Sequence, residues 1–188
     1  MKKGFSTALA VAIAAIVILL AAGAWYLTKP KDTDNTAATA SSQPAAVAKT
    51  LTDSCDILSQ EDAANVMNIT AIEKNGFVSG VTKETDNTKY ACTYASTDKD
   101  PAAYKAATAT VTRFNDATTA KAKFGSSKQA VSSPAVIATL GEDAYWDATA
   151  GSITVLKGTD VIVTSGGGLY KGDRETANQI AGYVLGHI

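Results

Sequence analysis

The stretch AYWDATAGSITVLKGTDVIVTS, residues 144–165, decides the fold class. Its apolar and β-branched residues predict three strands, at Ala144–Asp147, Ser152–Lys157 and Val161–Ser165. Only short turns separate them, one of them at Gly151. Strands joined by such tight turns run antiparallel, so the stretch predicts a meander.

Outward from the meander, the same reasoning predicts further strands and three helices. A strand is expected within residues 69–81, interrupted by a turn at Asn75-Gly76, and residues 82–88 are expected to form a polar loop. Two more strands are expected at residues 89–96 and 103–114. The expected helices are 60–67 after Ser59, 117 to about 129 after Asn115-Asp116, and 174–185 after Asp173.

The order of these elements is helix, strands, helix, strands, helix. It contains no βαβ alternation and no dinucleotide-binding glycine pattern. The sequence therefore predicts an α+β domain, an antiparallel sheet with helices packed on one face. We expect this domain at residues 51–188.

An uncharged apolar segment precedes this domain. Residues 8–27, ALAVAIAAIVILLAAGAWYL, would make a helix roughly 30 Å long, which matches the hydrocarbon core of a bilayer. We expect residues 1–27 to be a single N-terminal transmembrane helix. Residues 28–50 lack aromatic residues and are rich in Thr, Ala, Ser, Asp and Pro, which predicts a flexible, disordered linker.

Two alternatives remain for the N-terminal segment. Ala22-Gly23-Ala24 fits a signal-peptidase site, so the segment could be cleaved after Ala24. The start Lys3-Gly4-Phe5 resembles that of type IV prepilins, but Leu9 stands where those proteins need Glu, and Pro30 would stop the helix. The apolar run is long for a signal peptide, and Trp25 and Tyr26 stand where an interfacial aromatic belt would be, so we favour an uncleaved anchor, with the C-terminal domain outside the cytoplasm.

The charge of the domain argues against nucleic acid as a partner. From Leu51 onward the chain has twelve Lys or Arg and sixteen Asp or Glu, a net charge of −4. Phosphate backbones are bound by clustered Lys and Arg. We expect no nucleic-acid binding.

The two cysteines, Cys55 and Cys92, both follow the apolar segment. An even, minimal count in an exported domain predicts one disulfide. The alternative is a pair of buried free thiols in a cytosolic domain.

The chain resembles a group of known proteins through two motifs. The first is Cys55–Ala63, CDILSQEDA, and the second is Leu140–Trp146, LGEDAYW, with Cys92-Thr93-Tyr94 between them. These motifs are similar to those of small secreted proteins and lipoproteins of unknown function from high-GC Gram-positive bacteria, whose fold is similar to the PsbP class. The resemblance covers residues 51–188 and implies an exported α+β domain. It supplies no catalytic residues, and this chain lacks the lipid-attachment cysteine.

A search for catalytic and metal-binding patterns finds no convincing centre. His187 is the single histidine and stands one residue from the end of the chain. There it is better placed to interact as a cation with the C-terminal end of a helix than to act as a catalytic base. The acidic pairs at residues 98–100 and 142–143 lack calcium-loop spacing, and a weak calcium site is the alternative. We expect no catalytic residues, no metal and no cofactor.

Two features could contact a ligand. The run Ser165–Gly172, SGGGLYKG, is expected to be a flexible turn or strand-end bulge, with a ligand-contacting loop as the alternative. Aromatic residues on the strands are expected to pack in the core, but on an open face they could form a binding surface for an envelope protein, a glycan or a small hydrophobic ligand. The candidates for this surface are Tyr90, Tyr94, Tyr145, Trp146 and Tyr170.

These observations predict a membrane-tethered extracytoplasmic domain with a non-enzymatic binding or interaction role at the bacterial cell envelope. The alternatives are an envelope enzyme with a carboxylate- or metal-based site, and a purely structural envelope protein. A deep cleft with convergent carboxylates would favour the enzyme, and an exposed aromatic or apolar patch would favour binding.

Overall fold

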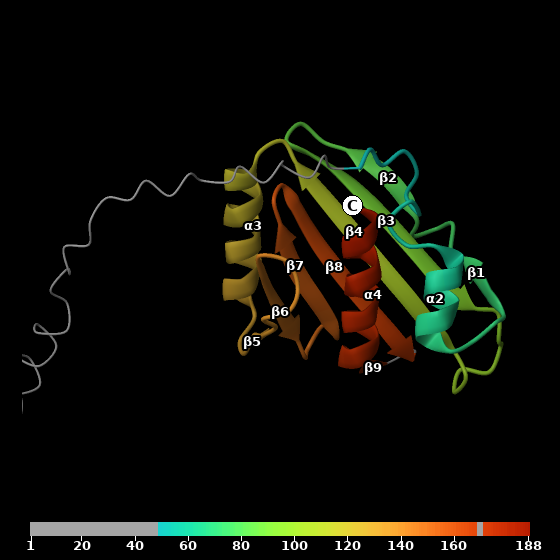
Figure 1. Cartoon of the computed structure of the whole chain (residues 1–188). Helices are drawn as coiled ribbons and strands as arrows, with labels where there is room; N and C mark the ends of the chain where they lie inside the picture. Colours follow the sequence, from blue (N-terminus) through green and yellow to red (C-terminus); the bar gives the residue numbers. More distant parts are fainter. Residues whose placement is uncertain (1–48, 169–170) are drawn as a thin grey trace, which may run out of the picture. The chain divides into compact units, whose positions relative to one another are not determined.

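The structure is a computed structural model that describes residues 49–168 and 171–188 (Figure 1). Three helices and nine strands lie in this part of the chain, and the predicted α+β class is confirmed. The helices are α2 (Gln60–Met67), α3 (Ala117–Ala130) and α4 (Arg174–His187). The strands are β1 (Ile72–Lys74), β2 (Gly80–Lys83), β3 (Asn87–Ser96), β4 (Lys105–Phe114), β5 (Ala135–Val136), β6 (Asp143–Asp147), β7 (Ser152–Lys157), β8 (Asp160–Gly168) and β9 (Lys171–Gly172).

All the strands belong to one antiparallel sheet in the order β1-β3-β4-β8-β7-β6-β5. Strand β2 also pairs with β3, and β9 pairs with β8. The predicted meander forms β6, β7 and β8, with left-handed glycines at Gly151 and Gly158 in its two turns. A positive φ is cheap only for glycine, which explains these two residues.

The larger core lies between the sheet and the helices α2 and α4, which lie side by side across it (Figure 1). Thr164 of β8 lies inside this core, and its hydroxyl donates a hydrogen bond of 2.9 Å to the Ala177 carbonyl of α4. This bond satisfies a polar group that would otherwise be costly to bury. The strand residues of this core occupy alternate positions, as a sheet with one face toward it requires. Among them are Cys92, Ala107, Ala109, Val111, Ala144, Ile153, Val155 and Ile162.

Helix α3 packs against the opposite face, so the prediction of helices on one face is wrong. Neighbouring strand residues point to opposite faces of a sheet. Ala144 belongs to the core under α4, whereas Tyr145 contacts Phe124 of α3, with the ring centroids 5.5 Å apart. The buried residues of this second cluster are Phe114, Ala120, Phe124, Tyr145, Leu156 and Val161. Because α3 has only two buried residues, its sequence does not indicate which face it covers.

The helix starts follow the predicted caps. The side chains of Ser59, Asp116 and Asp173 accept hydrogen bonds from the backbone N–H of the third residue after each. These bonds satisfy N–H groups that have no partner within the helix. The predicted loop at residues 82–88 is wrong at its ends, because β2 runs to Lys83 and β3 begins at Asn87. A hydrogen bond of 2.8 Å from Glu84 N to Asn87 O closes a tight hairpin there.

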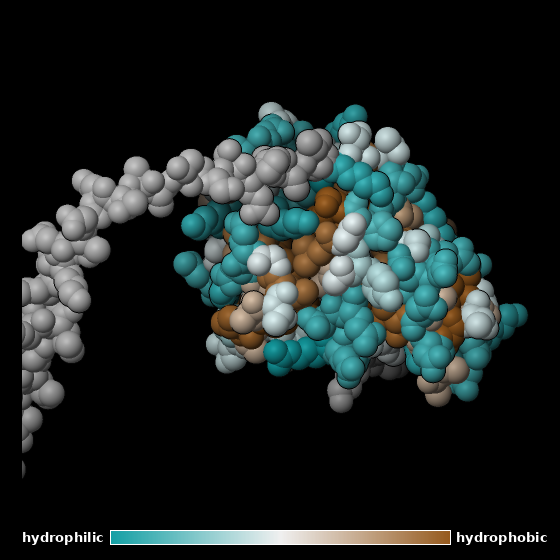
Figure 2. All heavy atoms as spheres, in the orientation of Figure 1, coloured by the Kyte–Doolittle hydropathy of each residue, from teal (hydrophilic) through white to brown (hydrophobic). Residues whose placement is uncertain are grey.

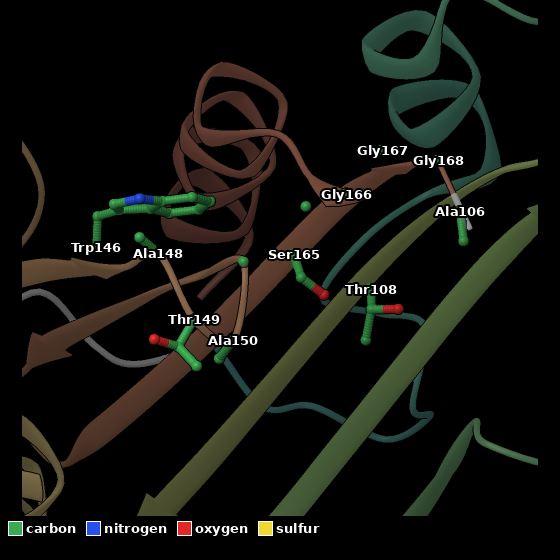
Figure 3. Close-up of a pocket in the computed structure, with 12 residues that line it drawn as sticks. Ala106, Thr108, Trp146, Ala148, Thr149, Ala150, Ser165, Gly166, Gly167 and Gly168 are labelled. Carbon is green, nitrogen blue, oxygen red and sulfur yellow. The ribbon is translucent and has the colours of Figure 1, made fainter. Parts of the chain in front are cut away.

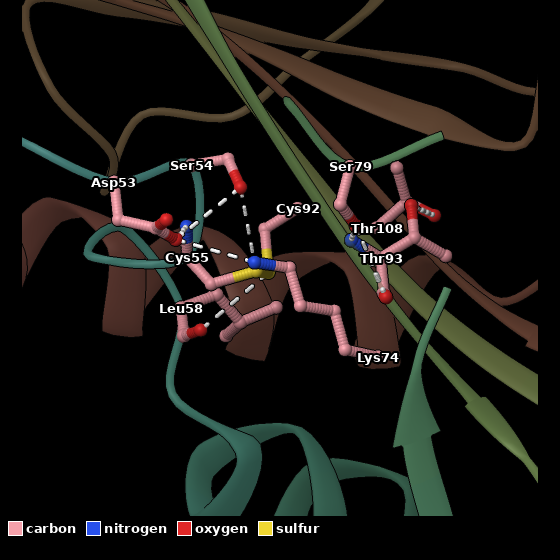
Figure 4. Close-up of a disulfide and its surroundings, with 9 residues drawn as sticks. All are labelled: Asp53, Ser54, Cys55, Leu58, Lys74, Ser79, Cys92, Thr93 and Thr108. Carbon is pink, nitrogen blue, oxygen red and sulfur yellow. Dashed lines mark hydrogen bonds and ion pairs between the residues drawn. A yellow bond between two sulfur atoms is a disulfide. The ribbon is translucent and has the colours of Figure 1, made fainter. Parts of the chain in front are cut away.

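The predicted disulfide between Cys55 and Cys92 is confirmed (Figure 4). It ties the turn before α2 to the middle of β3. The turn itself is held by Asp53, whose carboxylate accepts from the Cys55 N–H at 2.9 Å and pairs with Lys74 at 3.2 Å. The Cys55 N–H, followed by Lys74, lowers the pKa of this carboxyl. The disulfide therefore joins β3 to a turn whose conformation is stabilised by its own hydrogen bonds.

An ion pair joins β4 to the start of β8. Arg113 donates to both carboxylate oxygens of Asp160 at 2.8 Å, and a third N–H donates to the Lys49 carbonyl at 3.0 Å. The Asp160 side chain is only 7% exposed. These hydrogen bonds raise the pKa of Arg113, and such a bidentate pair holds the two strand ends in register.

The predicted anchor and linker lie at residues 1–50, of which the structure describes only 49 and 50. Within the described residues, no helix has the length and hydropathy needed to cross a bilayer. The predicted boundaries at residues 27 and 50 stay predictions. Figure 2 shows the side that carries α2 and α4 as mostly hydrophilic, with hydrophobic residues visible beside α4.

Candidate functional site

A pocket forms where the central strands of the sheet differ in length. Strand β7 starts at Ser152, which pairs with Ser165 of β8, but β8 continues to Gly168. Beyond Ser165, β8 has lost β7 as its neighbour and pairs with the short strand β9 instead. The turn between β6 and β7 meets β9 at Gly151 and Gly172. The pocket lies at this junction of the turn, β8 and β9.

The pocket has a volume of about 530 Å³ and is open to solvent on one side (Figure 3). This volume is in the range of about 300–1,000 Å³ that is typical of small-molecule sites. Its walls come from β4, β8, β9 and the β6–β7 turn. The lining residues are Ala106, Thr108, Trp146, Ala148, Thr149, Ala150, Gly151, Ser165, Gly166, Gly167, Gly168 and Gly172.

Three of these glycines are required by close packing. A Cβ on Gly166 would lie 2.5 Å from Cγ2 of Thr176 and 2.7 Å from Cδ1 of Ile180, so β8 could not approach α4 as it does. Gly172 and Gly151 touch each other through their backbones, and a Cβ on either would collide with the other. Sequence reasoning expected a flexible turn or bulge here, with a ligand-contacting loop as the alternative. The structure instead places Gly166–Gly168 in a paired strand that lines a pocket.

The turn that forms the opposite wall is held by Asp147. Its carboxylate accepts hydrogen bonds from the backbone N–H groups of Thr149 and Ala150, at 2.8 and 3.1 Å. Asp147 is thereby engaged in shaping the turn and is not among the lining residues. This arrangement presents the side chains of Thr149 and Ala150 at the mouth of the pocket, as Figure 3 shows.

Hydroxyl groups and one indole supply the polar chemistry of the pocket. Thr108 and Ser165 are cross-strand partners, so their side chains lie on the same face. The Thr108 hydroxyl shares a hydrogen bond of 3.1 Å with Thr93. Within the described residues, no protein group bonds to the side-chain hydroxyls of Ser165 and Thr149 or to the indole N–H of Trp146. These three groups remain available to a ligand or to solvent.

The lining residues that the structure describes carry no charge. None of these twelve residues is an Asp, Glu, His, Lys, Arg, Cys or Tyr. General acid–base catalysis needs a side chain that can exchange a proton near neutral pH, and a serine nucleophile needs such a neighbour to activate it. In the described lining, the groups that can contact a ligand are hydroxyls, an indole and small aliphatic side chains.

Of the four predicted aromatic surface residues that the structure describes, Trp146 is the one that lines this pocket. Trp146 is half-buried, and in Figure 3 its indole extends from the end of β6 toward Gly166. Tyr94 and Tyr145 are 7% and 3% exposed and lie in the two separate cores, and burial raises the pKa of Tyr94. Tyr90 is half-buried, and its hydroxyl donates to the Leu51 carbonyl at 3.4 Å. Tyr170 lies outside the described residues.

Other sequence candidates lie away from the pocket. His187 is 3.1 Å from the Asp62 carboxylate and joins the end of α4 to the first turn of α2. Among the described residues, no group of three or more His, Cys, Asp or Glu is placed to hold a metal ion. The lining hydroxyls that sequence reasoning missed are those of Thr108 and Thr149, because nothing in an isolated Thr marks it as the wall of a pocket, whereas Ser165 belongs to the run 165–172 that was the candidate ligand-contacting loop.

Comparison with known proteins gives little further information. No protein-family model and no curated protein sequence matches the chain. One similar solved structure is the extracellular domain of PknH from Mycobacterium tuberculosis, with 14% sequence identity and a TM-score of 0.48. That similarity covers 71% of this chain and 93% of the other. The resemblance to PsbP-like proteins stays a prediction.

Proposed function

We propose that this protein is a non-enzymatic, extracytoplasmic binding domain, and that its ligand occupies the pocket at the end of β8. The observation that carries the proposal is the composition of the pocket. It combines free hydroxyl groups, an indole and glycine backbone, and none of the lining residues that the structure describes is ionisable. Pockets that bind a ligand without transforming it need shape and hydrogen bonds, but no proton-transfer group.

The extracytoplasmic location is supported by the disulfide. The Cys55–Cys92 bridge uses both cysteines of the chain. Structural disulfides persist in oxidising compartments and are rare in a reducing cytosol. The apolar segment at residues 8–27 offers a means of export, either as an uncleaved anchor or as a signal that is removed.

The location can be tested by thiol alkylation in intact cells. We expect both cysteines to resist alkylation of the denatured chain unless a reductant is added first, since the bridge occupies both sulfur atoms. Alkylation without reductant would show free thiols and would contradict an oxidising location. A Cys55→Ala variant serves as the matched control, because its remaining Cys92 should react without reduction.

The pocket can be tested with a variant that fills it. Ala150 is exposed at the tip of the turn, and an Ala150→Trp substitution would place a large ring at the mouth of the pocket without disturbing either core. We expect native mass spectrometry to detect a small molecule from envelope extracts on the wild-type chain and not on this variant. Ala130→Trp, at the exposed end of α3, is the control. Equal ligand binding by all three proteins would place the site elsewhere.

A further inference from the structure

The geometry points to a neutral sugar as the ligand of the pocket, bound with one pyranose ring against Trp146. This inference rests on the proposed binding function and adds the chemical class of the ligand. It is drawn from three properties of the lining residues: their charge, the position of the indole, and the distribution of free hydrogen-bonding groups.

The charge of the lining excludes an ionic ligand. A charged group that enters a pocket loses hydration, and the loss must be compensated by an opposite charge or by several hydrogen bonds. None of the described lining residues carries a charge; of the carboxylates next to them in the chain, Asp147 is bonded to the backbone of the turn and Asp173 accepts from the Thr176 N–H as the cap of α4. A carboxylate, phosphate or ammonium group would therefore be bound poorly. The ligand that fits is uncharged.

The indole of Trp146 provides a flat apolar surface. Trp146 is half-buried and packs against the core under α4, on the face of the sheet opposite to the side chains of Ser165 and Thr108. It also lines the pocket, which therefore reaches both faces at the end of β7. Large aromatic rings with a fixed position bind at low entropy cost, and their N–H can serve as an additional polar contact. The apolar C–H face of a pyranose matches such a surface.

The remaining walls supply donors and acceptors to a molecule that carries several hydroxyl groups. The side chains of Ser165 and Thr149 come from different walls of the pocket, one from β8 and one from the turn. Each can donate and accept, and neither has a partner among the described residues. The glycines between them pair with β4 and β9, so the side-chain hydroxyls and the indole N–H are the groups that a ligand would have to satisfy. A purely hydrophobic ligand would leave these groups unpaired at a cost, so it fits less well than a sugar.

The chain permits a direct optical test. It has two tryptophans, Trp25 and Trp146, so a Trp25→Phe variant of the full chain reports on Trp146 alone. We would titrate this protein with glucose, galactose, mannose, N-acetylglucosamine and maltose, and follow the indole fluorescence. Glucuronate and glucosamine are matched probes that add one negative or one positive charge.

We expect at least one neutral sugar to change the fluorescence saturably, and the charged probes to bind at least about tenfold more weakly, which corresponds to about 1.4 kcal/mol. In the same background, Ser165→Ala should weaken binding by about two- to tenfold through the lost hydrogen bond. Ser126→Ala, which removes an exposed hydroxyl of α3, should leave the affinity unchanged.

Three results would overturn the inference: no saturable response to any of the five neutral sugars up to tens of millimolar, tighter binding of a charged probe, or equal weakening by Ser126→Ala. The experiments distinguish an error in the ligand class from an error in the location of the binding site. If the sugars do not bind but Ala150→Trp still abolishes binding of another small molecule, the pocket is a site for a different class. If that substitution has no effect on any ligand, both proposals fail.

Discussion

Removal of the disulfide should lower stability by an amount that follows from its place in the chain. The bridged cysteines are 37 residues apart. In the chain-entropy model, opening a loop of this size costs about 4 kcal/mol at 25 °C, because the unfolded state gains conformational freedom. For a domain of about 140 residues, the entropy of unfolding near Tm is about 0.3 kcal/mol per kelvin, so Tm should fall by about 13 °C.

The assay is urea and thermal unfolding of the C55A/C92A variant, followed by circular dichroism beside the oxidised wild-type chain. The wild-type chain in excess dithiothreitol is the second comparison, because it opens the bridge without removing either sulfur atom from the buried site. Cys92 is fully buried, so a difference between the reduced and the substituted protein measures the packing of its side chain. The free energies of unfolding of the reduced and the substituted protein should differ from each other by much less than either differs from that of the oxidised chain.

A decrease of less than about 1 kcal/mol in the free energy of unfolding of both samples, relative to the oxidised chain, would refute this reasoning. It would mean that the unfolded chain already holds residues 55 and 92 close together, or that the native bridge carries strain that offsets its entropic contribution. Measurement of the urea m-value separates these explanations, since only residual structure in the unfolded state of the reduced chain would change m.

Three further predictions follow from packing and charge. Gly166→Val should destabilise by about 1–3 kcal/mol in urea unfolding by forcing β8 from α4, whereas Gly182→Ala, with open space around its Cβ, should stabilise by about 0.5–1 kcal/mol. Asp160→Asn should lower the free energy of unfolding by about 3 kcal/mol, because it leaves Arg113 without its charge partner. A change near zero would contradict a structural role for this ion pair. The pKa of Asp116 is lowered by the Thr119 N–H, so its contribution is present above the unfolded pKa of about 3.8 and is lost as pH falls below it. When the free energy of unfolding is measured over a pH series, the Asp116→Asn variant should therefore lose less stability on acidification than the wild-type chain. An unchanged pH dependence would contradict the role of Asp116 as a helix cap.

Local sequence signals were enough to predict most elements and one covalent link. The meander at residues 144–165 could be recognised because strand residues alternate with turn glycines over a short distance. The helix starts could be recognised from Ser59, Asp116 and Asp173, because a cap involves only neighbours in the chain. The pairing of Cys55 with Cys92 follows from there being two cysteines on the same side of the apolar segment.

The sequence did not indicate which face of the sheet each helix covers. Helix α3 buries only Ala120 and Phe124, and this short apolar stripe fits either face equally well. The choice depends on Tyr145, whose ring packs against Phe124 on the face opposite α4. Such a contact joins residues that are far apart in the chain, so no local sequence pattern predicts it.

By itself, therefore, the sequence determined the α+β class, the disulfide, the helix starts and the meander. Only the tertiary structure decided the pocket. It depends on β8 being longer than β7, on Gly151 meeting Gly172, and on which of the aromatic residues remains outside the cores. Each of these is a relation between segments that meet only after the sheet has formed. The physical reason is that turns and caps are local interactions, whereas a pocket is the space left where long-range packing ends.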